Sequence, residues 1–134
     1  MQNRVYEEML VRFPEIAGPL EENADLPYLQ MHELGNWLEQ FAQDGIPAAV
    51  IKRVTDLWQW AQQQPSGQDA SDDIPTIVAV GLIEKLFRSS ATRVLLPHLL
   101  TEEALIRGAS YFKQWVGEDD YHKAWELFVR SSDF

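Results

Sequence analysis

The chain has 134 residues, of which 46% are hydrophobic and 11% aromatic, and its formal net charge is −10. This length and composition are those of one folded domain with a hydrophobic core, and they exclude a disordered chain. The acidic excess argues against nucleic acid or an anionic membrane as the partner, because both require clustered lysine and arginine.

No cysteine is present, which excludes a disulfide framework, a thiolate zinc site and a cysteine nucleophile. Charged residues occur from Arg4 onwards, so the first residues lack the apolar core of a signal peptide. The longest charge-free apolar stretch, residues 74–83, is far shorter than the roughly 20 residues that a membrane-spanning helix needs. We therefore expect a soluble, cytoplasmic protein.

Apolar residues recur at the spacing of an amphipathic helix along most of the chain. Proline and glycine delimit these stretches, because proline suits the first turn of a helix and glycine the position after its last turn. The segment 14–26 contains Gly18 and Pro19 and is predicted to be a loop with at most one helical turn. The predicted helices span approximately residues 3–13, 27–44, 47–64, 74–89, 91–100, 101–116 and 118–130.

The helix predicted over residues 74–89 is apolar in almost every direction, which is typical of the buried centre of a domain. Asp72 or Asp73 would cap its start. A strand over residues 76–80 is the weaker alternative, because helix-forming residues follow directly.

The polar stretch 65–73 is predicted to be an internal loop, since neither half of the chain is large enough to bury a core comfortably alone. We therefore predict an all-α fold. Residues 1–134 would form a single domain of six or seven helices, packed as antiparallel hairpins around the helix 74–89.

Motifs for nucleophilic catalysis or phosphate binding do not occur in the sequence. Asp119, Asp120 and His122 could form a weak site for a divalent cation, but an acidic first turn that stabilises the helix dipole is the favoured interpretation. Glu84 falls within the apolar helix 74–89 and could be a buried catalytic acid. A structural glutamate, either ion-paired or turned toward solvent beside Lys85 and Arg88, is favoured. We predict no enzymatic activity, cofactor or metal.

Between Arg12 and Lys52 the chain contains no lysine or arginine but seven acidic residues. Such a one-sided negative field speeds and orients the encounter with a basic partner, although acidity can also serve solubility alone. Trp60 lies off the apolar stripe of its predicted helix, and tryptophan is enriched at interface hot spots. Cover by another helix or by the loop 65–71 is the alternative. The predicted partner-binding residues are Glu15, Glu21, Glu22, Asp25, Glu33, Glu39 and Trp60.

Three segments in this order carry a family resemblance: Phe13-Pro14-Glu15-Ile16, Pro27-Tyr28-Leu29 through Leu34, and Val80-Gly81-Leu82-Ile83-Glu84-Lys85-Leu86. Over residues 5–128 the chain resembles small acidic, all-helical bacterial immunity proteins encoded beside polymorphic toxins, such as Rhs-type, contact-dependent or type VI effectors. The resemblance implies an inhibitor that occludes the active site of a cognate toxin and brings no catalytic residue with it. A basic toxin fits, and a nuclease is one such class because nucleases carry basic clefts. A non-catalytic adaptor with another partner is the alternative function.

Overall fold

The computed structural model of the chain describes residues 4–65, 67 and 73–132. Within these residues every regular element is helical, which confirms the predicted all-α fold. In chain order the elements are α1 (Arg4–Arg12), η1 (Pro14–Ile16), α2 (Ala17–Glu22), α3 (Pro27–Leu38), η2 (Glu39–Phe41), α4 (Ala48–Gln62), α5 (Ile74–Phe87), α6 (Ser90–Arg93), α7 (Leu96–Leu99), α8 (Glu102–Arg107), α9 (Ala109–Val116) and α10 (Glu118–Ser132), where η denotes a 3-10 helix.

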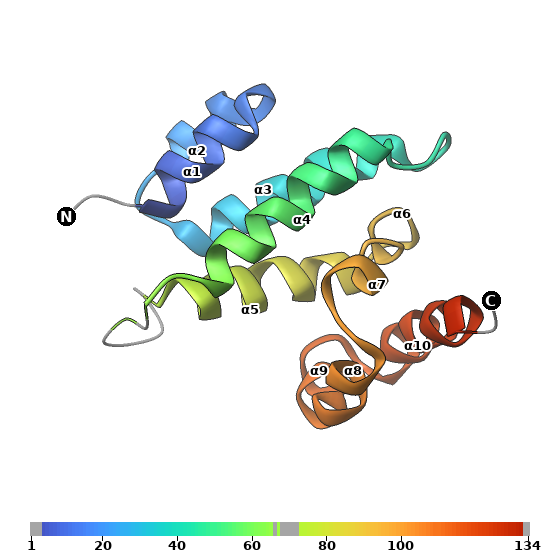
Figure 1. The fold of residues 1–134 in the computed structure, drawn as a ribbon. Coiled ribbons are helices and arrows are strands. Elements are labelled where there is room, and N and C mark those ends of the chain that lie inside the picture. Colours follow the sequence, from blue (N-terminus) through green and yellow to red (C-terminus); the bar gives the residue numbers. More distant parts are fainter. Residues whose placement is uncertain (1–3, 66, 68–72, 133–134) are drawn as a thin grey trace.

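Helix α5 is the centre of the fold, as its apolar sequence predicted (Figure 1). Helix α3 makes the most extensive contact with it, and α4, α7, α9 and α10 also pack against it. Helices α3 and α4 run in opposite directions, while α1 and α2 lie on one side of the molecule and α8 to α10 on the other (Figure 1). The residues of α5 that are buried by this packing are Ile74, Ile77, Val78, Gly81, Leu82, Ile83, Leu86 and Phe87.

Two glycines permit the close crossing of α3 and α5. A Cβ atom placed on Gly81 would lie 3.0 Å from the Cβ of Met31, so a larger residue would push the two helices apart. Gly35 of α3 receives the aliphatic stem of Lys85, whose Cγ would lie 2.2 Å from an added Cβ. The close packing of α3 on α5 therefore depends on having glycine, which has no side chain, at positions 35 and 81.

The structure divides several predicted segments more finely than the sequence analysis did. The helix predicted over 27–44 ends as an α-helix at Leu38 and continues as η2, and the predicted loop 14–26 contains η1 and α2. The helix predicted over 101–116 is interrupted at Gly108, where a Cβ would lie 2.6 Å from the ring of Phe112. The ring of Phe112 thus packs against a glycine that also separates α8 from α9.

Asp73 caps the start of α5, as predicted for one of two aspartates. Its Oδ2 accepts a hydrogen bond from the backbone N–H of Thr76 at 3.1 Å, and its Oδ1 accepts one from the N–H of Gly67 at 2.7 Å. The Thr76 hydroxyl also donates to Asp73 Oδ2, and this side-chain bond, followed by the bond from Gly67, lowers the pKa of the Asp73 carboxyl. Asp72, with residues 66 and 68–71 of the predicted loop, lies outside the described residues. None of the helices in the described part of the chain has the length and apolar content needed to cross a membrane.

Candidate partner-binding surface

Glu15, the first of the predicted partner-binding acids, is bound within the chain by Arg53 of α4. The two guanidinium Nη atoms donate to the two Glu15 carboxylate oxygens at 2.9 and 2.6 Å, and Nε donates to the carbonyl of Arg12 at 2.9 Å. The same guanidinium lies over the rings of Phe13, 4.8 Å from the centroid, and Trp37, at 5.5 Å. Its hydrogen bonds lower the pKa of the Glu15 carboxyl. Glu15 therefore joins η1 to α4.

Glu39, the last of the predicted partner-binding acids in the chain, also has a partner within the fold. Its Oε1 lies 4.0 Å from the Nζ of Lys85, whose stem crosses Gly35. At this distance, and with 44% of the Glu39 side chain exposed, the pair contributes little to stability. It nevertheless places a positive charge beside Glu39, so Glu15 and Glu39 each have a cationic side chain of the fold next to them.

Four further acids lie between Glu15 and Glu39 in the chain. Glu21, Glu22 and Asp25 are exposed and Glu33 is half-buried, and none forms an ion pair with a residue that the structure describes. They lie at the end of α2, in the turn that follows it and in the second turn of α3. We call Glu21, Glu22, Asp25 and Glu33 the acidic surface.

The position of Glu21 and Glu22 is electrostatically unfavourable for the fold. They are the last two residues of α2, at the negative end of the helix dipole. Acidic side chains stabilise the opposite end of a helix. Folding therefore does not account for two carboxylates at this place.

A buried glutamine holds the turn between α2 and α3 in place. The Nε2 of Gln30 donates to the carbonyl of Asn23 at 2.8 Å and to that of Ala24 at 3.1 Å, and the Gln30 side chain is fully buried. Asn23 in turn donates from Nδ2 to the carbonyl of Pro19, within α2. Because the turn is tied to both helices, the acidic surface has a defined geometry.

Two exposed leucines lie within the acidic surface and were missed by the sequence analysis. Leu26, directly after Asp25, is 51% exposed, and Leu29, one turn later, is 42% exposed. Residues 29 and 33 share one face of α3 by helical spacing, and Leu26 is the N-cap residue directly before this helix. A signal was present in the sequence, since Leu26 and Leu29 fall outside the apolar stripe of Met31, Leu34 and Leu38.

Trp60, the predicted aromatic contact, is half-buried and packs against the core. The buried residues of the same helix are Val50, Val54, Leu57 and Ala61. Trp60 is therefore partly covered, which was the alternative considered from the sequence. The structure gives it a packing role, and its contact with a partner stays a prediction.

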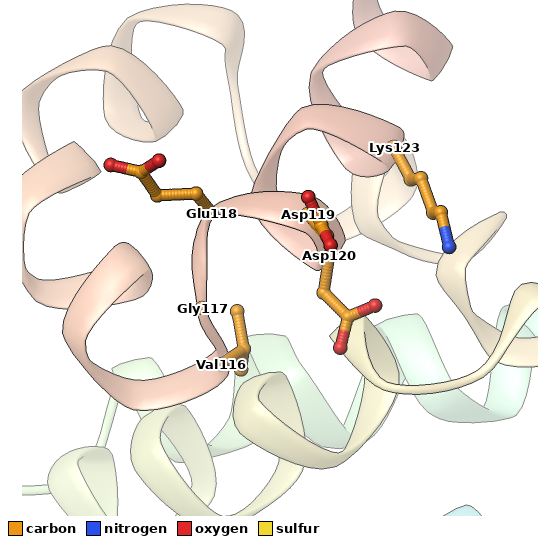
Figure 2. A pocket seen from close by; sticks show the side chains of 6 residues that line it. All are labelled: Val116, Gly117, Glu118, Asp119, Asp120 and Lys123. Atoms are coloured by element: carbon orange, nitrogen blue, oxygen red, sulfur yellow. The ribbon is translucent and has the colours of Figure 1, made fainter.

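A second group of acids occupies the first turn of α10. Figure 2 shows the open hollow at this turn, with the side chain of Glu118 directed away from that of Asp120. Asp120 accepts a hydrogen bond from Nη2 of the buried Arg93 at 3.2 Å. The residues described contain no group of three side chains suited to hold a metal ion, so Asp119, Asp120 and His122 do not form the cation site considered from the sequence.

Glu84, in the last turn of α5, is half-buried and ion-paired. Its Oε1 accepts from Nη2 of Arg88 at 2.9 Å, and 29% of its side chain is exposed. Arg88 also donates to the carbonyl of Trp115 at 3.1 Å, which links α5 to the end of α9. Glu84 is thus an ion-paired structural glutamate, as the favoured interpretation of the sequence predicted.

Comparison with protein-family models, curated proteins and solved structures gave no significant match. The resemblance to immunity proteins therefore stays a prediction, and the functional argument rests on the residues themselves.

Proposed function

We propose that the chain is a cytoplasmic immunity protein that binds a cognate toxin and covers its active site with the acidic surface. One observation carries the proposal: Glu21, Glu22 and Asp25 are exposed and have no counter-ion among the residues that the structure describes, whereas Glu15 and Glu39 are paired within the fold. Unpaired carboxylates at a fixed position attract a basic surface and orient it as it approaches.

The unfavourable placement of Glu21 and Glu22 supports a binding role. Charges that reduce the stability of a fold are typical of functional sites, where activity and stability conflict. A basic cleft is the partner that best compensates these unfavourable charges. Each lysine or arginine brought to the acidic surface reduces the mutual repulsion of the carboxylates, and it also offsets their unfavourable interaction with the dipole of α2. A toxin that acts on an anionic substrate has such a cleft, and its occlusion would block substrate entry.

The proposal is tested by co-expressing the tagged full chain with the product of the adjacent upstream gene. We expect a one-to-one complex and suppression of the toxicity of that product. The triple variant E21K/E22K/D25K should bind at least 100-fold more weakly, since close charge pairs across interfaces couple by about 1.5 to 7 kcal/mol. It should also fail to protect the cell.

The matched control is E7K/E102K/E126K, which changes three exposed acids outside the segment 13–51. Each replacement adds two charges, so both triple variants change the net charge from −10 to −4. The control should bind within a few-fold of the wild type. If both triple variants lost the same amount of affinity, the net charge of the chain, and not the position of the acids, would account for binding. Absence of any complex, or a complex with a non-toxic partner, would contradict the immunity function.

A further inference from the structure

We infer that Leu26 and Leu29 form the apolar anchor of the partner interface, and that the surface they enter is an apolar hollow bordered by lysine and arginine. This inference rests on the proposed function and specifies the partner surface. The acidic surface then serves as the charged rim around the two leucines. An apolar centre with a polar rim is the usual organisation of a specific protein interface.

The two leucines lie close together along the chain, since Leu26 is the N-cap residue of α3 and Leu29 is in its first turn. The N–H of Leu29 donates to the carbonyl of Leu26 at 3.0 Å, which fixes their relative position. About half of each side chain is left exposed, at 51% and 42%, although the same helix buries Met31, Leu34 and Leu38 completely. Single exposed leucines are common, but two exposed leucines three residues apart, with carboxylates before and after them in the chain, form an amphipathic segment.

The charges around the leucines decide what can cover them. A second copy of the chain, docking through the same face by two-fold symmetry, would place acidic residues opposite acidic residues. Nucleic acids and anionic membranes carry the same sign of charge as this face. The fitting occupant is a protein surface with an excess of lysine and arginine and an apolar hollow for two adjacent leucines.

The backbone that carries the two leucines is already held in a defined conformation before a partner binds. The Gln30 hydrogen bonds to Asn23 and Ala24 hold the turn, and Leu29 belongs to a regular helix. Little backbone order must therefore be gained when the partner binds, and the burial of the leucines contributes to affinity with little entropic loss.

The experiment measures the affinity of the full chain for the co-purified toxin, using the variant L26S/L29S and the control V11S/I106S. The control removes two branched apolar side chains, of Val11 and Ile106, that are 79% and 53% exposed on other helices. We expect L26S/L29S to bind about 30-fold more weakly, because burying the remaining half of each leucine corresponds to roughly fivefold in affinity. The control should bind like the wild type.

The salt dependence of binding separates this inference from the proposed function. In L26S/L29S the slope of affinity against salt concentration should stay that of the wild type, since the carboxylates are intact, whereas E21K/E22K/D25K should lose it. A photo-reactive residue at position 29 should crosslink to the toxin, and one at position 106 should not. If the wild type binds and protects but L26S/L29S binds within threefold of it and position 29 does not crosslink, the anchor is wrong and the immunity function stands. If the wild type forms no complex, the proposed function fails first.

Discussion

The acidic surface and the first turn of α10 contain similar numbers of acids but differ in what the fold does with them. Glu118 and Asp119 lie at the N-terminus of a long helix, where the dipole favours negative charge, and Asp120 is held by Arg93. Glu21 and Glu22 lie at the C-terminus of a short helix, where the dipole opposes them. The position of a carboxylate on its helix, and the presence of an internal cation, therefore distinguish acids that stabilise the fold from acids that are available to a partner.

The largest effect is expected at the arginine that anchors the α10 acids. Replacing Arg93 by Met removes a buried guanidinium whose Nε donates to the carbonyl of Phe87 at 2.7 Å and whose Nη2 contacts Asp120. The carbonyl loses its buried donor and Asp120 loses its counter-ion. We expect the free energy of unfolding to fall by about 3 kcal/mol, measured by urea denaturation.

The control for this loss is Arg107→Met, which removes an ion pair to Glu103 that is 79% and 69% exposed. Such a pair is screened by water, and its removal should change the free energy of unfolding by less than about 1 kcal/mol. Equal effects at Arg93 and Arg107 would show that the fold does not depend on the α10 acids being anchored, and the contrast with the acidic surface would then disappear.

Sequence periodicity was sufficient to predict the longer helices and the central position of α5, because a helix buried on all sides has apolar residues in almost every direction, as residues 74–87 do. It was not sufficient for η1 and α2, which lie in the segment 14–26 that was predicted to be a loop. The break at Gly108 was not predicted. It depends on the ring of Phe112 packing where a side chain would otherwise be, and a one-dimensional pattern does not contain that contact.

The candidate site was predicted only in part for the same reason. The sequence located the acids but could not indicate that Arg53 and Lys85, distant in the chain, would pair with Glu15 and Glu39. Leu26 and Leu29 were missed because a leucine outside the apolar stripe can still be covered by another helix. Their exposure is established only by the packing of all helices together.

A smaller effect, of opposite sign in the two regions, is expected from charge reversal. E118K/D119K places two positive charges at the N-terminus of α10 and should lower the free energy of unfolding by about 1 kcal/mol at low ionic strength. E21K/E22K places two positive charges at the C-terminus of α2 and should raise it by a similar amount. Both changes should shrink in 1 M salt. A loss of stability in both variants would mean that Glu21 and Glu22 have a structural role that their position does not suggest.

The smallest effect on the free energy of unfolding is expected at Glu15, the acid that is paired with Arg53 and precedes the acidic surface in the chain. The hydrogen bonds from Arg53 lower its pKa below the ordinary value of 4.5, so its contribution to stability is present above that value and is lost as the pH falls through the lowered pKa. In E15Q the charge is absent, and the difference in unfolding free energy from the wild type should be at most about 1 kcal/mol at pH 7. It should shrink steadily as the pH is lowered below 4.5. E126Q is the control for removing an exposed glutamate charge. A difference between E15Q and the wild type that is constant with pH would show that the carboxylate charge does not hold η1 to α4, and that the carbonyl and ring contacts of Arg53 are sufficient.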